Sequence, residues 1–261
     1  MKTDREEHPT SENPPYAIKT ASTLLEILRL CLDARARHFC SFRGQRRKEW
    51  KLGLHGIVDD VSLDRHFKQF KLRCMEFPRP HYIEEWDELR WLYYAQHHGL
   101  KTRLLDWTKD PLVAIYFAVE NILSHCDDDR DFGAIWVLHV NQCDFLYPGS
   151  AKTGDAFQPQ DWILIDPPPV TPRLARQSGL FSYHTGPTGV FAIDERARRD
   201  GEMLMKIEIV PDLPGGANPS RKIREQLGIM NVHHASLFPD PDGIAQFANY
   251  EWPIISVPPR V

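Results

Sequence analysis

The sequence contains few cysteines and no long apolar run. Its five cysteines are widely spaced, and no two of them form a CxxC motif. An odd number at such spacing argues against a disulfide framework and against a structural zinc site, so we expect no bound metal. No stretch approaches the ~18 apolar residues of a membrane span, and the first ten residues lack the apolar core of a signal peptide. These absences predict a cytoplasmic protein that does not contact a membrane.

The short motifs of the commonest nucleotide-binding and hydrolytic enzymes are missing as well. Neither GxGxxG nor GxxxxGK[ST] occurs, and neither GxSxG nor HExxH is present. The chain also lacks an excess of positive charge, because 32 Lys and Arg face 36 Asp and Glu, for a net charge of −4. A protein whose main task is to coat nucleic acid is therefore disfavoured. The remaining composition, with 42% hydrophobic and 26% charged residues, is typical of a folded globular protein.

Local patterns predict helices and strands in an order that does not alternate regularly. Residues 1–19 are polar, contain three prolines and show no periodicity, so we expect a flexible N-terminal arm before one domain over residues 20–261. Helices are expected at 24–32, 82–97, 111–123, 221–227 and 242–250, and strands at 38–42, 134–140, 162–166 and 204–210. A doubly wound sheet would alternate the two. We therefore predict an α+β single domain with a mixed or antiparallel sheet flanked by helices.

Several residues fit the ends of these helices. Thr23 suits the N-cap of a capping box, and Asp110 followed by Pro111 suits a second helix start. The free N–H groups of that second helix are also a candidate anion site. Gly99 and Gly228 are placed to end two other helices.

A basic stretch follows the first predicted strand. Residues 43–51 hold five basic groups and one acid. Arg43 could bind a phosphate or carboxylate with two parallel hydrogen bonds, and Gly44 beside it allows a turn or a close approach of a ligand. The alternative is an ion pair of Arg43 on the rim of the sheet.

Two later segments carry further candidate residues. Residues 96–99 end a predicted helix, where His98 is expected to point into a cleft and bind a ribose or phosphate, or else to complete the last turn. Residues 102–108 bring Asp106, Trp107 and Thr108 to the start of the next helix. These three residues can contribute to a ligand site, or can cap backbone groups and pack in the core.

Taken together, these segments and several others resemble the FRG domain, a family named for a Phe/Tyr-Arg-Gly tripeptide. The matching segments are 42–45 (FRGQ), 94–99 (YAQHHG), 102–108 (TRLLDWT), Pro111, 116–118 (YFA), 176–181 (RQSGLF), 227–229 (LGI) and 237–240 (LFPD). They span roughly residues 38–247. The combined set is specific, whereas the tripeptide alone means little. This resemblance identifies a family rather than a reaction.

More distantly, the chain resembles the ADP-ribosyltransferase fold. In that fold an early strand ends in Arg or His-Gly, a second strand carries Ser or Thr, and a later one carries an acid or an amide. Arg43 matches the first position and Thr108 matches the hydroxyl position, while His98 with Gly99 matches the His-Gly form; the two alignments exclude each other. The candidates for the third position are Gln177, which we prefer, and Glu202 and Glu208.

This resemblance implies an enzyme that consumes NAD, either ADP-ribosyltransferase-like or an NAD glycohydrolase, acting as a toxin or antiphage effector. Cleavage of the nicotinamide–ribose bond creates an oxocarbenium-like cation, which a carboxylate or amide stabilises while an arginine holds the pyrophosphate. Trp107 could stack on the nicotinamide. The expected catalytic residues are Arg43, Thr108 and Gln177, and the expected ligand-binding residues are Gln45, His98, Asp106 and Trp107. The partner is an anionic nucleotide-like molecule, with NAD as a substrate and no required cofactor.

Two alternatives stay open. The basic stretch at 43–51 favours a non-catalytic module that binds a nucleotide or nucleic acid. A metal-dependent nuclease is the least favoured, because only Asp106 and Asp110 approach a cluster of carboxylates, and both suit turn and cap positions.

Overall fold

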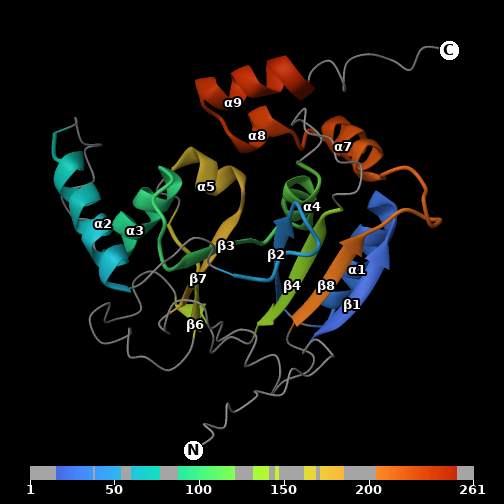
Figure 1. The fold of residues 1–261 in the computed structure, drawn as a ribbon, viewed down its shortest axis with the longest axis horizontal. Helices are drawn as coiled ribbons and strands as arrows, with labels where there is room; N and C mark the ends of the chain where they lie inside the picture. The colour runs from blue at the N-terminus through green and yellow to red at the C-terminus, as the bar shows by residue number, and fades with distance from the viewer. Residues whose placement is uncertain are drawn as a thin grey trace, which may run out of the picture.

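The computed structural model contains one mixed sheet with helices packed against it (Figure 1). It describes residues 16–37, 39–53, 60–76, 88–120, 132–140, 145–146, 162–168, 171–184 and 204–251. Within these ranges eight strands follow the order β1-β8-β4-β2-β3-β7-β6-β5. Strand β1 is parallel to β8 and β5 is parallel to β6, whereas the other neighbours are antiparallel. The predicted α+β class with a mixed, helix-flanked sheet is confirmed.

The strands and helices have the following bounds. The strands are β1 (Ala17–Ala21), β2 (Phe39–Gln45), β3 (Leu104–Thr108), β4 (Ala134–Val140), β5 (Phe145–Leu146), β6 (Trp162–Ile165), β7 (Gly179–His184) and β8 (Leu204–Ile209). The helices are α1 (Leu24–Arg35), α2 (Asp60–Cys74), α3 (Glu88–His97), α4 (Pro111–Ala118), α5 (Pro172–Arg176), α7 (Ser220–Ile229), α8 (His234–Leu237) and α9 (Pro241–Gln246), with a π-helix η4 at Phe247–Glu251.

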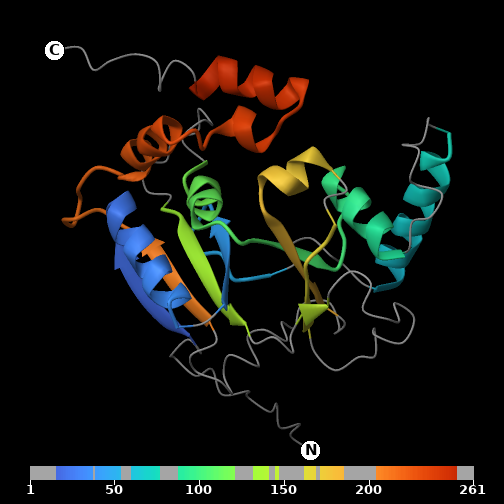
Figure 2. The same ribbon diagram turned by 180° about the vertical axis from the view of Figure 1, so that it is seen from behind.

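The sheet divides into two halves between β2 and β3. Strands β2 and β4 are paired along their whole length, and β3 is paired along its whole length with β7. In contrast, the described register between β2 and β3 consists of the single pair Phe42 and Thr108. Both ribbon views show the group β1-β8-β4-β2 spreading away from the group β3-β7-β6 (Figure 1 and Figure 2). The two halves therefore meet at one end and open toward the other.

The helices of both halves cover the same face of the sheet. Helices α1, α4 and α7 share one apolar core with β2, β4 and β8. Helix α3 covers the other half, where Tyr93 stacks on Phe181 with ring centroids 4.9 Å apart. Phe42 of the first core pairs with Thr108, and Phe181 of the second pairs with Asp106 two residues earlier on β3. Paired residues on neighbouring strands share a face of the sheet, and so do every second residues along one strand. Phe42 and Phe181 therefore lie on the same face, and so do the two cores and the helices that cover them.

Helix α4 packs very closely on β2, and Gly44 makes this possible. A Cβ at Gly44 would lie 2.7 Å from the Ala118 nitrogen and 2.9 Å from the Phe117 Cβ, and closer still to the Ala114 carbonyl oxygen. A Cβ at Gly133, just before β4, would likewise collide with the Ala118 carbonyl. The missing side chain of Gly44 thus admits a helix. Gly44 also lines a pocket, so the close approach of a ligand at this position stays a prediction.

Several of the predicted helix ends are confirmed, whereas the helix start expected at residue 82 lies outside the described residues. Thr23 forms the capping box of α1, and Asp110 caps α4 by accepting a hydrogen bond from the Leu112 N–H at 2.8 Å. Gly99 follows α3 with a φ of +85°, a backbone conformation that favours glycine. Gly228 does not end α7, which continues to Ile229.

Other elements depart from the expectation. Strand β1 begins at Ala17, inside the expected arm; four of its five residues are exposed, so no apolar alternation marked it. Helix α4 ends at Ala118, and residues 121–123 of the expected helix lie outside the described residues. The last expected helix divides into α9 and η4. Helices α2, α5 and α8 and strand β7 were not predicted. No described helix is long and apolar enough to cross a membrane.

Candidate functional site

A pocket of about 340 Å³ lies where β2 and β3 diverge, and α3, α4 and α5 contribute to its walls. Small-molecule sites usually measure ~300–1,000 Å³, so this volume suits a compact ligand or part of a larger one. Six of the seven predicted site residues line it: Arg43, Gln45, Asp106, Trp107, Thr108 and Gln177. Segments distant in sequence therefore meet as expected.

Arg43 lies at the divergence of the two strands. Its Nη1 donates to the backbone carbonyl of Asp106 at 2.8 Å, at a place where the backbone of β2 no longer pairs with β3. The same nitrogen lies 3.9 Å from the Asp106 carboxylate, and 19% of the Arg43 side chain is exposed. Its buried Nε has no hydrogen-bond partner among the described residues. Burial lowers the pKa of the guanidinium, and Asp106 opposes this effect. The guanidinium keeps donors for a ligand.

The Asp106 carboxylate is both oriented and accessible. Gln96 Nε2 donates to its Oδ1 at 2.7 Å, and the Gln96 Oε1 in turn accepts from the Thr102 hydroxyl. The Asp106 side chain nevertheless stays 63% exposed. A fixed anion therefore faces the pocket beside a guanidinium.

Thr108 and Gln177 are placed together, but their polar groups are largely occupied. The Thr108 hydroxyl donates to the Gln177 carbonyl at 2.7 Å and accepts from the Asp110 N–H at 3.0 Å. Gln177 Nε2 donates to the Leu237 carbonyl at 3.2 Å. Because Asp110 also caps α4, the anion site expected at that helix start is filled by the protein's own carboxylate. These residues hold the pocket wall in shape.

Gln45 and Trp107 are also engaged in internal contacts. Gln45 is buried, and its Oε1 accepts from the Trp136 indole at 2.7 Å. Trp107 is 3% exposed and donates its indole N–H to Ser182 at 2.9 Å. Its ring belongs to the core on the face opposite the helices, so the core-packing alternative holds for this residue.

His98, the seventh predicted residue, does not line the pocket; the preceding His97 does. His98 is exposed and lies edge-on to the Tyr94 ring at 4.5 Å. Burial, Arg173 and His98 lower the pKa of His97 to about 4, against a smaller opposing effect of Asp240. His97 is therefore a neutral donor and acceptor near pH 7.

This lowered pKa predicts a loss of stability in mild acid. Between about pH 6.5 and 4 the unfolded chain binds a proton at His97 that the folded chain does not, so stability falls as the pH falls. The lowered pKa values of His233 and His234 act in the same direction. We expect the urea midpoint to drop between pH 7.5 and 5, and to drop less in His97→Gln. His98→Gln is the matched control, and an equal pH slope in His97→Gln and the wild type would contradict the assignment.

Two charged residues of the pocket were missed in the sequence: Arg173 on α5 and Glu120 just after α4. The Arg173 guanidinium lies 4.2 Å from the centroid of the Phe238 ring. Burial lowers the pKa of Arg173 and raises that of Glu120. For Glu120 the sequence contained one indication of its place. Glu120 follows Phe117 by three residues, and residues at this spacing lie on one side of a helical turn.

Of the two rival acids for the third position, Glu208 does not line this pocket. Glu208 lies on β8, where it pairs with Lys206 at 3.1 Å and with Lys48 at 3.8 Å. Glu202 lies outside the described residues. Across the ranges that the structure describes, no group of three or more His, Cys, Asp or Glu side chains is arranged to hold a metal ion.

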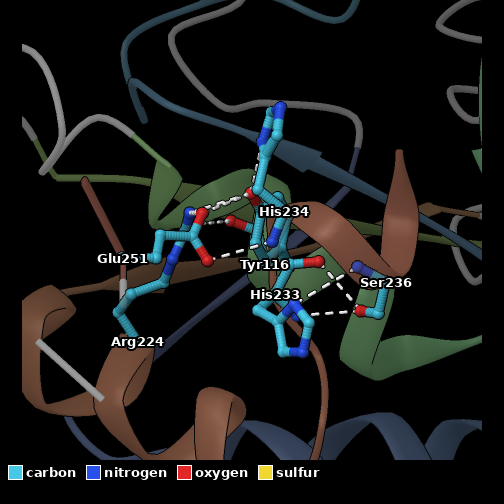
Figure 3. Close-up of polar contacts among 6 residues, drawn as sticks. All are labelled: Tyr116, Arg224, His233, His234, Ser236 and Glu251. Atoms are coloured by element: carbon cyan, nitrogen blue, oxygen red, sulfur yellow. Dashed lines mark hydrogen bonds and ion pairs between the residues drawn. The ribbon is translucent and has the colours of Figure 1, made fainter. Parts of the chain in front are cut away.

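A buried polar cluster joins α4 to the C-terminal helices (Figure 3). Arg224 of α7 donates through Nη2 to the Tyr116 hydroxyl at 2.8 Å and to the Glu251 carboxylate, and its Cζ lies 3.8 Å from the Tyr116 ring centroid. The Tyr116 hydroxyl donates to Glu251 Oε1 at 3.0 Å, and Glu251 Oε2 accepts from the His234 N–H at 2.9 Å. His234 Nδ1 lies 2.9 Å from the same hydroxyl. The neighbouring His233 caps α8 by accepting from the Ser236 N–H. Four side chains thus fasten α4, α7, α8 and η4 together.

The C-terminal helices support the pocket from outside. The pocket residues Phe117, Arg173 and Gln177 contact Phe238 or Leu237 at the end of α8. No described residue beyond β7 lines the pocket itself. The C-terminal segment therefore positions site residues rather than supplying them.

Comparison with known proteins agrees with the motif content. No curated protein and no solved structure matches the chain. The family model of the FRG domain matches residues 38–127, a segment that carries Arg43, Asp106 and Glu120 of the pocket. The chain therefore contains an FRG domain.

Proposed function

We propose that this protein cleaves the nicotinamide–ribose bond of NAD, as a glycohydrolase or as an ADP-ribosyltransferase-like enzyme. The observation that supports this most directly is the accessible Asp106 carboxylate, held by Gln96 beside Arg43 at the divergence of the two half-sheets. In a cell such an activity would make the protein a toxin or antiphage effector in the cytoplasm.

The charges around the pocket suit a dinucleotide that carries both signs. Arg43, Arg46 and Arg173 line it together with the carboxylates of Asp106 and Glu120. Arginine binds phosphate oxygens with paired donors, so the three guanidinium groups are suited to a pyrophosphate. The nicotinamide ring of NAD is cationic and suits a nearby carboxylate.

Asp106 is better suited than Gln177 to stabilise the cationic transition state. As the bond to nicotinamide breaks, positive charge develops on the ribose, and a preorganised carboxylate lowers the energy of that charge. The Asp106 carboxylate is already oriented by Gln96, whereas the Gln177 amide is committed to Leu237. In this proposal Arg43 binds the pyrophosphate, and Thr108 and Gln177 hold the wall.

The test measures nicotinamide release from NAD together with the melting temperature. We expect wild-type turnover, stabilisation by NAD, and a loss of about 100-fold or more in kcat for Asp106→Asn, because that variant removes the charge and keeps the shape. Arg43→Gln should mainly raise KM. Arg221→Gln, at an exposed residue of α7, is the control and should keep full activity.

Two results would count against cleavage. If the wild-type protein neither releases nicotinamide nor melts at a higher temperature with NAD, the proposal fails. Stabilisation by NAD without turnover would instead favour the alternative, a non-catalytic nucleotide-binding module. That alternative is supported by Arg46 and Arg47, whose guanidinium carbons lie 5.8 and 5.9 Å from the centroid of the Trp50 ring, itself part of the pocket lining.

A further inference from the structure

We propose that Glu120 is a catalytic residue of this pocket, and that its carboxylate takes the proton from the water or acceptor group that attacks the ribose. This inference rests on the proposed function and adds a residue that neither the tripeptide motif nor the predicted site includes. Two observations support it. Glu120 lines the pocket, and among the described residues its carboxylate has no hydrogen bond or close ion pair that would compete with a ligand.

Glu120 is the second carboxylate, after Asp106, among the described residues that line the pocket. It lies directly after α4 and lines the pocket with Phe117. Among the described residues its carboxylate forms neither a hydrogen bond nor an ion pair within 4 Å, in contrast to Asp106. A half-buried carboxylate that lines a cavity and has no hydrogen-bond partner among the described residues is available to a ligand.

The charges that face Glu120 come from three helices and from the segment after β2. Arg224 of α7 and Arg173 of α5 favour its ionised form, as does Arg46 after β2, whereas Glu251 of η4 opposes it. Burial outweighs these contributions and raises the pKa of Glu120 above its ordinary value of 4.5. A base with a pKa closer to neutral pH accepts a proton more effectively in the transition state.

The other candidate bases of the pocket are less suited to this step. His97 has a pKa of about 4 and binds a proton weakly. Asp106 accepts a hydrogen bond from Gln96, and its carboxylate lies 3.9 Å from Arg43. Glu120 is the remaining carboxylate among the described lining residues.

The step balances in atoms and charge. The bond between the ribose C1′ and the nicotinamide nitrogen breaks, and its electron pair neutralises the pyridinium ring, which leaves as nicotinamide. The oxygen of water, or of an acceptor group, bonds to C1′. Its proton passes to the Glu120 carboxylate and from there to solvent. No oxidant or reductant is needed.

The test compares wild-type protein with Glu120→Gln in water and in sodium azide. We expect Glu120→Gln to lose about 100-fold or more in kcat while it binds ADP-ribose as the wild type does. Azide carries no proton to remove, so it should restore nicotinamide release in Glu120→Gln and yield ADP-ribosyl azide. A merely structural role would not be rescued in this way.

A second measurement needs no substitution, and covers the case in which Glu120→Gln does not fold. The wild-type kcat should rise with pH through a pKa above 4.5. A wild-type kcat that is flat from about pH 4.5 to 8 would overturn the assignment of Glu120.

The outcomes separate the two proposals. If the wild-type protein releases no nicotinamide, the proposed function fails, and the role of Glu120 fails with it. If the wild type is active and Glu120→Gln is equally active, or loses activity that azide does not restore although ADP-ribose still binds, only the role of Glu120 is overturned.

Discussion

Replacing Gly44 with alanine should destabilise the domain by about 3 kcal/mol or more, which is the upper end of the cost of overpacking a core. The added methyl group would lie 2.7 Å from the Ala118 nitrogen and 2.9 Å from the Phe117 Cβ, and the nearest atom is the backbone carbonyl of Ala114. Two of these three atoms belong to the backbone, so no rotamer change relieves the collision. Either α4 shifts or the sheet bends. Urea denaturation of the two proteins measures the difference.

The control for this prediction is Gly215→Ala. Gly215 has a φ of +76°, and a Cβ added there would meet no described atom within 4 Å, so alanine costs only backbone strain, about 1 kcal/mol. Because Gly44 does not have a positive φ, an equal loss in both variants would contradict the expected collision with α4. We also expect Gly44→Ala to weaken ligand binding, because α4 leads to Phe117 and Glu120 in the pocket.

Replacing Arg224 with methionine should cost about 3–5 kcal/mol of unfolding free energy, as expected when one partner of a buried ion pair is removed. The Arg224 and Glu251 side chains are 2% and 1% exposed. Among the described residues, the substitution leaves the buried Glu251 carboxylate with hydrogen bonds from Tyr116 and His234. The double variant Arg224→Met with Glu251→Gln should recover part of the loss, because it removes the uncompensated charge. Chemical denaturation of the single and double variants measures this coupling.

The same helix supplies a matched control. Arg221 forms an ion pair with Glu225 at 3.4 Å, one turn along α7, with side chains 72% and 42% exposed. Arg221→Met should therefore change stability by less than ~1 kcal/mol. If Arg224→Met were as mild as Arg221→Met, the cluster of Figure 3 would not hold the C-terminal helices on α4.

The sequence was sufficient for elements whose signal is local. Capping residues marked the starts of α1 and α4, and apolar runs marked β4, β6 and β8, because these strands are central or buried and repeat a simple pattern. Strand β1 has an exposed outer edge and carried no such pattern. Helix α8 has four residues, which is too short for a helical period to appear.

The candidate site could be predicted in outline but not in its chemistry. Family motifs brought six of the seven residues to one pocket, since the motifs follow the strands that meet there. The sequence predicted His98 as a pocket residue, whereas the adjacent His97 lines the pocket. The end of a helix cannot be located to within one residue from sequence. Trp107 donates a hydrogen bond to Ser182, and Gln45 accepts one from Trp136. Because these partners are distant in the chain, the sequence did not show that both polar groups are occupied.

The pairing of the first strand with the last has a consequence for biosynthesis. Ala17 of β1 pairs with Met205 of β8, so the N-terminal strand has no partner in the sheet until most of the chain has left the ribosome. Closing such a long loop is entropically costly and slows folding relative to local contacts. The nascent chain must therefore keep this segment from pairing elsewhere, and completion of the sheet edge is expected to be among the last events of folding.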